Sequence, residues 1–398
     1  MIHFFNPGHE AAVLNGSPYY HAPANVLVMQ CDLAFLPAWY AGEGDIVLTE
    51  NALPEEFLHY YHDLADWKVA AIQQNNWRHD LVSSTELALW GVSPQGIHLF
   101  EKINETFGSS FVLPVWDARI VGFSHREKAR SYLLQLSQKY SFIPDYLIPE
   151  FYTSLDAIEK LLNTHPGVRF LAKAPFSSSG RGLLWLPEDV LTQTERQILH
   201  GFIRRQGAVS VEYVLKRKCD FAMEFFCDGK DDCRFIGYSL FDTSSKGNYT
   251  GNRILSQETI FQHLSSRIPL EQLEGIKQSF LEFFSEDISS FYKGYVGVDM
   301  MIYDDHGTEC LHPCVEINLR SNMGMLCIEL QRKYIHPDAQ GIFQVEYAGA
   351  LPAAWENHQA DKEKNPPVFL DGKMYSGYFP LCPVTPESHY RAYILLKP

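Results

Sequence analysis

Residues 296–324 read VGVDMMIYDDHGTECLHPCVEINLRSNMG, and this stretch constrains the architecture more than any other in the chain. Two runs rich in apolar and β-branched residues flank the turn-forming residues 304–307, which predicts a β-hairpin. The second strand alternates, so that its apolar face carries Val315, Ile317 and Leu319. Its opposite, polar face carries Glu316, Asn318 and Arg320.

The polar face of this strand has the chemistry of a magnesium site. Alternate residues on a strand lie about 7 Å apart, so Glu316 and Asn318 can hold one ion or two neighbouring ions. Asp299 on the first strand is a candidate third ligand. Hard oxygen ligands from few side chains, with room for phosphate oxygens, suit Mg²⁺. The alternative is an amphipathic strand whose polar face is simply solvated.

The register of the hairpin decides whether Asp299 joins this site. A tight turn at residues 305–306 would place Asp299 opposite His312 rather than Glu316. Because Pro313 has no N–H to donate to the ladder, the second strand is predicted to begin near Cys314. A longer loop over residues 304–311 would restore the pairing of Asp299 with Glu316, although hairpin loops usually have about two to five residues. The metal role of Asp299 therefore depends on such a loop.

Bulk composition sets the class of protein. A chain of 398 residues is expected to contain two or three domains. The net charge of −15 argues against a nucleic-acid or anionic-membrane binder, because no basic field offsets phosphate repulsion. The start, MIHFFNPGHE, lacks a basic region followed by an apolar run, and no stretch approaches 18 apolar residues. We therefore expect a cytoplasmic protein.

The eight cysteines are scattered through the chain, which predicts reduced thiols rather than a disulfide framework. Cys310, His312 and Cys314 form a C-x-H-x-C pattern. Zinc sites usually pair one such knuckle with a second, and no clear second knuckle is present, so structural zinc is the weaker interpretation.

The N-terminal region predicts an open parallel sheet. Apolar runs at residues 2–6, 45–48 and 68–72 are separated by helix-like segments. The segment Asn6-Pro7-Gly8-His9-Glu10 follows the first strand, at the end where α/β sheets bind ligands. A G-x-G-x-x-G fingerprint is absent, which disfavours a dinucleotide-dependent oxidoreductase.

A second motif predicts a phosphate loop. An apolar strand ending at Lys173 is followed by PFSSSGRG (residues 175–182) and by a further strand over residues 183–186. Small side chains let backbone N–H groups approach phosphate oxygens, and Lys173 adds a point charge. This is a hairpin rather than a Walker loop, whose signature is absent. The alternative is a flexible hairpin without a ligand.

The order of these motifs resembles the ATP-grasp superfamily. The matching pieces are FLAKAPFSSSGRG (170–182), VEYV (211–214), CDFAMEFF (219–226) and GVDMM…CVEIN (297–318). The resemblance covers roughly residues 120–325 and implies an α/β (α+β) fold with two subdomains around an ATP cleft. It implies domains at residues 1–122, 123–214, 215–330 and 331–398, the last packing on the core or forming a homo-oligomer contact.

The resemblance also implies roles for individual residues. Lys173 would contact the α- and β-phosphates, and Lys128 or Arg126 would provide an earlier phosphate-binding cation. Asp220 would bind the ribose. The loop over the β- and γ-phosphates would comprise Ser177, Ser178, Ser179, Gly180, Arg181 and Gly182. The hinge holding adenine would comprise Glu212 and the backbone of Tyr213 and Val214.

Asp299, Glu316 and Asn318 would bind two Mg²⁺ ions, with Glu316 bridging them. Arg320 and Arg253 are candidates for contact with the reacting substrate. Further cleft candidates are Trp77, Arg78 and Trp90, for which burial in the core is the commoner interpretation.

The chemistry that the resemblance implies is carboxylate activation. ATP would phosphorylate a carboxylate, and an amine or thiol would displace phosphate from the acyl-phosphate. The leading hypothesis is thus an ATP- and Mg²⁺-dependent carboxylate–amine ligase acting on small-molecule substrates. The alternatives are a kinase that phosphorylates a small molecule and a nucleotide-binding module without catalysis.

Overall fold

The computed structural model describes residues 1–64, 69–73, 85–108, 111–177 and 182–398, and the structural statements below refer to these. The predicted site residues Trp77, Arg78, Ser178, Ser179, Gly180 and Arg181 lie outside the described residues.

The N-terminal part forms the predicted parallel sheet. Its strands β1 (Ile2–Phe4), β2 (Ile46–Thr49), β3 (Ala70–Gln73) and β4 (Leu87–Leu89) lie in the order β3-β2-β1-β4. Short apolar strands suit such a sheet because both of its faces are covered. The strand order reverses between β1 and β4, which makes their carboxyl ends a topological switch point. The accompanying helices are α1 (His9–Asn15), α2 (Ala24–Asp32), the 3-10 turn Leu36–Trp39, α3 (Glu55–Leu64) and α4 (Pro94–Phe107).

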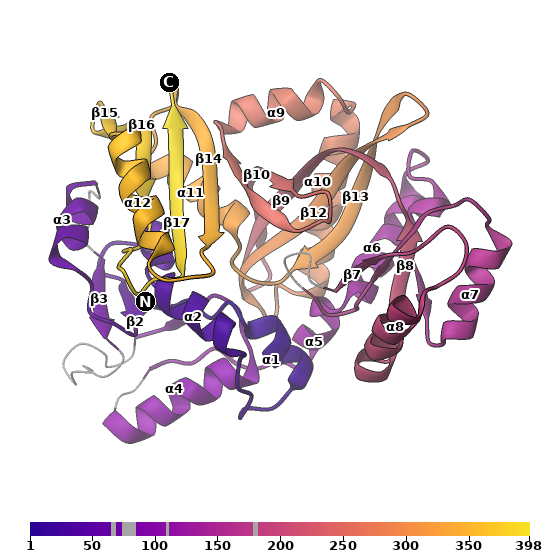
Figure 1. Cartoon of the computed structure of the whole chain (residues 1–398), viewed down its shortest axis with the longest axis horizontal. Helices are drawn as coiled ribbons and strands as arrows, with labels where there is room; N and C mark the ends of the chain where they lie inside the picture. Colours follow the sequence, from indigo (N-terminus) through magenta and orange to yellow (C-terminus); the bar gives the residue numbers. More distant parts are fainter. Residues whose placement is uncertain (65–68, 74–84, 109–110, 178–181) are drawn as a thin grey trace.

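A small antiparallel unit follows, at the right of Figure 1. Its strands β5 (Glu150–Tyr152), β6 (Phe170–Lys173), β7 (Leu183–Trp185) and β8 (Val209–Tyr213) lie in the order β5-β8-β6-β7. Helices α7 (Leu155–Thr164) and α8 (Gln193–Gln206) bury Ile158, Leu162 and Leu199 against the sheet. Ser154 caps α7, and β6 pairs antiparallel with β7 as predicted.

A nine-stranded antiparallel sheet forms the centre of the molecule, in the order β13-β12-β9-β10-β11-β14-β17-β16-β15. Residues 331–398 supply four of these strands, so the C-terminal segment continues the sheet rather than standing apart (Figure 1). The strands are β9 (Lys216–Asp228), β10 (Cys233–Thr243), β11 (Tyr249–Ile254), β12 (Lys293–Asp305), β13 (Thr308–Asn318), β14 (Gln340–Tyr347), β15 (Val368–Leu370), β16 (Lys373–Pro380) and β17 (Tyr390–Lys397).

The two faces of this sheet differ in chemistry. On β9, Phe221, Met223 and Phe225 point into the largest apolar core, against Phe280 and Phe284 of α10. The intervening residues Asp220, Ala222 and Glu224 therefore point to the opposite face, which is the candidate cleft. The other helices are α5 (Arg119–Ser124), α6 (Arg126–Lys139), the 3-10 turn Asp145–Leu147, α9 (Gln257–Ser265), α10 (Leu270–Asp287), α11 (Met323–Lys333) and α12 (Ala353–Lys364).

The β12–β13 hairpin has its predicted turn within residues 304–307, and the expectation that the second strand begins near Cys314 is wrong. Asp305 pairs with Thr308 across a two-residue turn, in which His306 and Gly307 both have positive φ. The register then shifts, so that Met301 faces His312 and Asp299 faces Glu316. Residues 313–315 oppose Met300 alone, as a bulge at the proline that cannot donate to the ladder.

The expectation that all cysteines are reduced is also wrong. Cys227 and Cys233 form a disulfide, because the β9–β10 hairpin pairs these two residues directly across its turn. The other six cysteines are free. Within the described residues no three His, Cys, Asp or Glu side chains form a metal-binding group, so the Cys310–His312–Cys314 pattern does not make a zinc site there.

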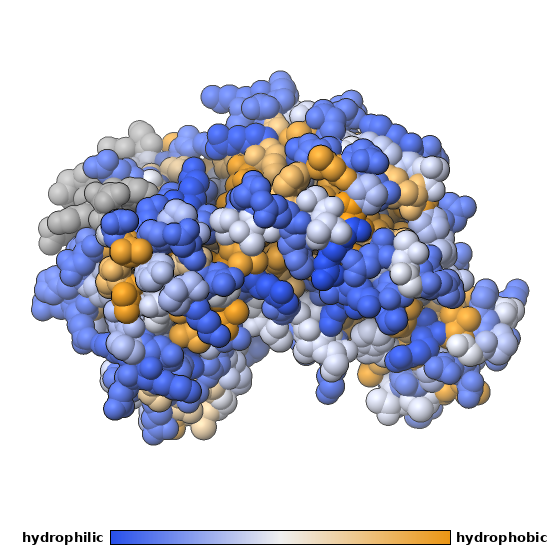
Figure 2. Space-filling view, turned by 90° about the horizontal axis from the view of Figure 1, so that it is seen from above, coloured by the Kyte–Doolittle hydropathy of each residue, from blue (hydrophilic) through white to orange (hydrophobic). Residues whose placement is uncertain are grey.

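The surface is mostly polar on the face shown in Figure 2, with apolar side chains gathered towards its middle. Among the helices that the structure describes, none combines the length and the apolar character needed to cross a membrane.

Phe225 offers a test of the central core. Its side chain is fully buried and lies edge-on to Phe284, with ring centroids 5.2 Å apart. We expect Phe225→Ala to lower the free energy of unfolding by about 3–5 kcal/mol, measured by denaturant titration. Val190, which is 68% exposed, supplies the control: Val190→Ala should change the value by less than about 0.5 kcal/mol. Similar losses in both variants would contradict the assignment.

Candidate active site

The cleft face of the central sheet carries three rows of side chains, each row crossing strands β9, β12 and β13. Because the strands pair in register, the rows follow from the ladder itself, and successive rows lie about 7 Å apart. The rows are Asp220, Met301 and His312; Ala222, Asp299 and Glu316; and Glu224, Gly297 and Asn318.

The middle row holds two of the three predicted metal ligands, Asp299 and Glu316. Asp299 lies opposite Glu316, and Asn318 is hydrogen-bonded to Asp299 from the next row. Burial raises the pKa of Asp299 well above its ordinary value, and the carboxylates of Glu316 and Glu224 raise it further. The ionised form of Asp299 is thus destabilised by burial and by the neighbouring carboxylates.

These residues fit a magnesium site. Two carboxylates and an amide oxygen are hard ligands, and a divalent cation would relieve the repulsion that raises the pKa of Asp299. The set is too small to complete the shell alone, which suits an ion that is also held by phosphate oxygens.

Arg126 is the cation that the structure brings to this row. Its Nη2 lies 3.0 Å from Glu316 Oε2 and 3.2 Å from Ser177 Oγ, and its Nε donates to the Ala174 carbonyl at 3.2 Å. The first residue of α6 therefore joins the phosphate hairpin to β13.

Lys128, the other predicted cation on α6, is directed elsewhere. Its Nζ pairs with Asp287 Oδ2 at 2.6 Å and lies over the rings of Phe123 and Tyr132. Two positions along a helix rotate a side chain by more than half a turn, which explains why Arg126 and Lys128 face different partners.

The phosphate hairpin places Lys173 and Ser177 at the cleft. Lys173 is buried at the end of β6, with its Nζ 2.5 Å from Glu212 Oε1. Gly182 has a φ of +89°, and a Cβ there would lie 2.9 Å from Ser177 Cβ, so the hairpin requires glycine at this position.

Two residues of the predicted adenine-binding hinge, Tyr213 and Val214, make contacts within the β6–β8 part of the sheet. The ring of Tyr213 packs on Phe170, with centroids 5.0 Å apart. The Val214 N–H donates to the Arg169 carbonyl at 3.0 Å, because the β6–β8 ladder continues one residue past β8. That N–H is therefore already bonded within the sheet, whereas Glu212 faces the cleft beside Lys173.

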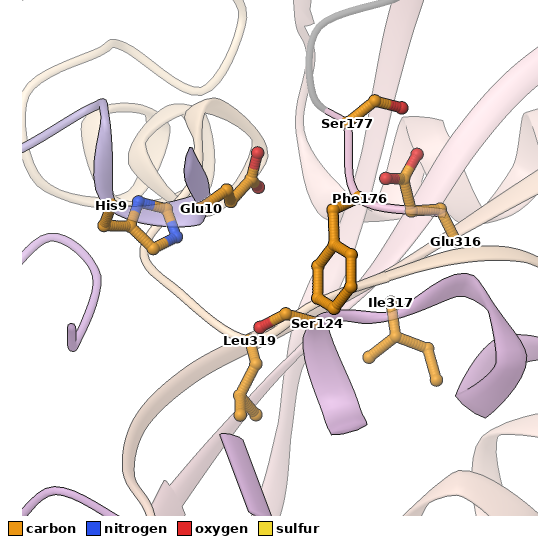
Figure 3. Close-up of a pocket in the computed structure, with 8 residues that line it drawn as sticks. All are labelled: His9, Glu10, Ser124, Phe176, Ser177, Glu316, Ile317 and Leu319. Carbon is orange, nitrogen blue, oxygen red and sulfur yellow. The ribbon is translucent and has the colours of Figure 1, made fainter. Parts of the chain in front are cut away.

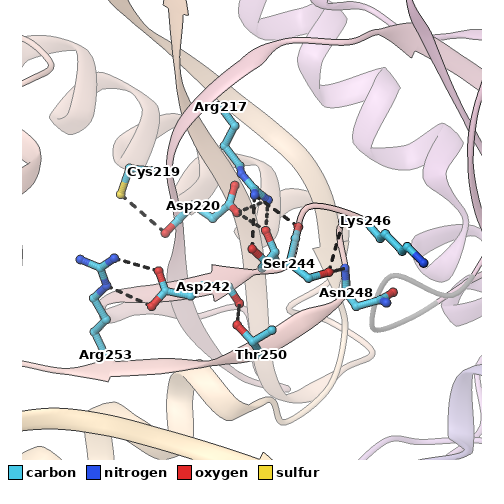
Figure 4. A network of polar contacts seen from close by, with 10 residues as sticks. Arg217, Cys219, Asp220, Asp242, Ser244, Lys246, Asn248, Thr250 and Arg253 are labelled. Atoms are coloured by element: carbon cyan, nitrogen blue, oxygen red, sulfur yellow. Dashed lines mark hydrogen bonds and ion pairs between the residues drawn. The ribbon is translucent and has the colours of Figure 1, made fainter.

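Asp220 and Arg253 have separate polar partners, as Figure 4 shows: Asp220 lies beside Arg217, whereas Arg253 is bonded to Asp242. Asp220 Oδ2 accepts from Thr243 Oγ1 at 2.7 Å and lies 3.1 Å from Arg217 Nη1. Arg253 pairs with Asp242, with Nη2–Oδ1 at 2.8 Å.

The strand register explains the position of Arg253. Arg253 pairs with Leu240, which pairs with Phe221 on the core face of β9. Side chains at paired positions share a face, so Arg253 points away from the cleft. The prediction that Arg253 contacts substrate in this cleft is therefore not supported by its position.

Arg320 joins Asn318 to the N-terminal region. Its Nε lies 2.7 Å from Glu10 Oε1, and its Nη2 donates to Asn318 Oδ1 at 3.1 Å. Glu10 belongs to α1, directly after β1, and thus lies at the β1–β4 switch point. Asn6 fixes this point by bonding both the carbonyl (2.8 Å) and the N–H (3.1 Å) of Gly91.

A hollow of about 310 Å³, part of it open to solvent, separates the two sides of the site. Figure 3 shows His9 and Glu10 on one side, with Ser177 and Glu316 on the other and Phe176 between them. Burial lowers the pKa of His9 to about 4, so its imidazole is neutral near pH 7. Its ring packs on Gly91, where a Cβ would lie 2.1 Å away. Trp90, a predicted cleft residue, is buried in the core against Phe5.

Glu224 is a site residue that the sequence interpretation missed. It is only 1% exposed, and it accepts from Ser239 Oγ at 3.2 Å and from Asn322 Nδ2 at 2.7 Å. The signal was present, since CDFAMEFF alternates with period two and places Glu224 on the same face as Asp220.

The titration of Glu224 can be measured through stability. Burial raises its pKa from 4.5 to about 7, so the folded protein holds this proton more tightly than the unfolded chain does. Stability is therefore lost as the pH rises from about 4.5 through 7. We expect Glu224→Gln to remove this loss and to have a higher Tm than the wild type at pH 8 but not at pH 5, measured by calorimetry. The exposed Glu356→Gln is the control, and parallel Tm profiles for wild type and Glu224→Gln would contradict the assignment.

Comparison with known proteins adds evidence at the level of structure only. No family model matches the chain, and no curated protein matches its sequence. The biotin carboxylase of Campylobacter jejuni, solved as a β,γ-ATP complex, aligns with 100% of this chain and 87% of its own, at a TM-score of 0.51 and 10% identity. The biotin carboxylase domain of the Hydrogenobacter thermophilus 2-oxoglutarate carboxylase, solved with MgADP, ADP and bicarbonate, aligns with 100% of this chain and 86% of its own, at a TM-score of 0.50 and 11% identity.

Both similar structures are ATP-grasp enzymes, and each alignment covers this whole chain. The predicted mixed α/β class and the predicted architecture are thereby confirmed. The chain has the ATP-grasp fold.

Proposed function

We propose that this protein is an ATP- and Mg²⁺-dependent ligase that activates a carboxylate as an acyl-phosphate for attack by an amine or thiol. The proposal rests above all on one continuous line of charged and polar side chains. It runs from Arg126 through Glu316, Asp299 and Asn318 to Arg320 and Glu10, and so links the phosphate hairpin to the switch point of the N-terminal sheet.

The nucleotide would lie along the rows of the cleft. Glu212 and Tyr213 would face the base, Asp220 the ribose, and Lys173 and Arg126 the phosphates, with residues 177–182 over the triphosphate. Asp299, Glu316 and Asn318 would hold two Mg²⁺ ions. When bound, Mg²⁺ would supply positive charge to neutralise the phosphate oxygens during transfer.

The acceptor would bind at the far end of the line. A carboxylate oxygen attacks the γ-phosphorus, the bond to the β-phosphate oxygen breaks, and ADP leaves. The nucleophile then attacks the acyl carbon, loses its proton and releases inorganic phosphate. Arg320 would hold the anionic group of the acceptor, next to the hollow lined by Glu10 and Glu316.

Domain organisation and location follow from the same proposal. Residues 1–122 would present the acceptor, residues 123–214 and 215–330 would enclose ATP, and residues 331–398 would brace the core. We propose the cytoplasm as the compartment because it supplies ATP.

The direct test is release of ADP and inorganic phosphate from ATP and Mg²⁺ across a panel of amino acids, dipeptides and other small carboxylates, each with an amine or thiol partner. A ligase releases free phosphate only with the correct pair, whereas a kinase gives ADP and a stable phosphorylated acceptor. ATP binding without turnover of any acceptor would favour a non-catalytic module.

Substitution of Glu316 tests the metal row. We expect Glu316→Gln to lower kcat at least about 100-fold, because one carboxylate is lost where phosphoryl charge is neutralised. The measurement is the steady-state rate of ADP release at saturating ATP and Mg²⁺. Glu309→Gln on the same strand is the matched control, since Glu309 pairs with Arg267 at the far end of β13. Full activity in Glu316→Gln would exclude the metal assignment.

Substitution of Glu10 tests the acceptor end. Glu10→Gln weakens the hold on Arg320, so we expect the KM of the acceptor to rise about tenfold or more while the KM of ATP changes less than twofold. Initial rates with either substrate varied will separate the two constants. Glu43→Gln, at an exposed position of the same N-terminal region, should alter neither. A rise in the KM of ATP alone would place Glu10 at the nucleotide instead.

A further inference from the structure

The bulge in β13 places His312 in the cleft. In a regular strand His312 and Glu316 would be separated by about 13 Å, since they are four positions apart in the sequence. The bulge at residues 313–315 shortens this separation, because Met301 and Asp299, their partners on β12, are only two positions apart. His312 therefore occupies the row directly next to the metal row, on the other side of Met301 from Asp220.

The imidazole of His312 is buried and incompletely bonded. The residue is 5% exposed, and within the described part of the chain its Nδ1 has no hydrogen-bond partner. Buried polar atoms of this kind are rare, because an unmet hydrogen bond is costly. His312 lines a second hollow together with Ser210, Glu212 and Arg126, so the ring lies where a ligand could complete its bonding.

The neighbours of His312 indicate which part of a nucleotide would approach it. Glu212, assigned above to the base, and Lys173, assigned to the phosphates, are both close enough to influence its charge. The sugar is the part of ATP that lies between base and phosphates. Burial also lowers the pKa of His312 to about 4, so the ring is neutral near pH 7 and suits a hydroxyl partner better than a phosphate.

We propose that His312 is a nucleotide-binding residue that hydrogen-bonds a ribose hydroxyl of ATP, opposite Asp220. The inference rests on the proposed function and extends it, since the resemblance to the ATP-grasp superfamily implied a ribose contact for Asp220 alone. Together the two side chains make the cleft selective for ribonucleotides.

The test compares the dissociation constants of ATP, 2′-deoxy-ATP and 3′-deoxy-ATP by calorimetry in the presence of Mg²⁺. The wild type should bind ATP at least about tenfold more tightly than one of the deoxy analogues, the range of a single hydrogen bond. His312→Ala should weaken ATP about tenfold and lose that preference. His312→Gln, which keeps a polar group, should retain part of it, whereas His312→Phe, which keeps the ring, should not.

His306→Asn is the matched control. His306 lies at the exposed tip of the same hairpin with a φ of +51°, a conformation that asparagine tolerates. If His312→Ala fails to fold, the Gln and Phe variants decide the question by the same ratio. A wild type that binds all three nucleotides equally, or a His312 variant that keeps the full preference, overturns the inference and leaves the proposed function standing. A wild type that binds no nucleotide overturns the proposed function itself.

Discussion

The concentration of carboxylates on one face of the central sheet is the constraint on which the site depends. Asp299, Glu316 and Glu224 lie in adjacent rows, in surroundings that raise the pKa of Asp299 and Glu224. Such a cluster persists only where cations or hydrogen bonds compensate it. Arg126 comes from α6 and also holds the phosphate hairpin, while Arg320 reaches Glu10 of the N-terminal region. The two arginines that compensate the carboxylates therefore also connect the phosphate hairpin and the N-terminal region to the central sheet.

Alternation along strands was the most reliable source of prediction. It assigned the faces of β13 and would have found Glu224 on β9, because a period of two fixes a side chain's face wherever the strand is regular. The open α/β sheet, the β6–β7 hairpin and the ATP-grasp architecture were likewise predictable from local patterns and their order.

Predictions failed where local pattern leaves register undetermined. Pro313 indicated a break in the ladder, but the sequence could not distinguish a long loop from a tight turn with a bulge, and only the bulge brings His312 beside the metal row. Arg253 lies on the face opposite the cleft, and its face depends on how β11 pairs with β10, which the local sequence does not determine. Arg126 and Lys128 could be separated only once the axis of α6 was placed.

The ion pairs of the cleft indicate how charged ligands could bind there without a large electrostatic free-energy penalty. Lys173 is paired with Glu212, Arg126 with Glu316, and Arg320 with Glu10. Removing either partner alone would leave a poorly solvated charge, which is strongly unfavourable in such surroundings. A triphosphate would attract Lys173 and Arg126 away from their partners Glu212 and Glu316. Divalent cations that bind with it would compensate the charge of these carboxylates, so the site would stay balanced in charge. Nucleotide and metal should therefore bind cooperatively, because the phosphates pair with the lysine and arginine while the metal ions pair with the carboxylates that these cations leave.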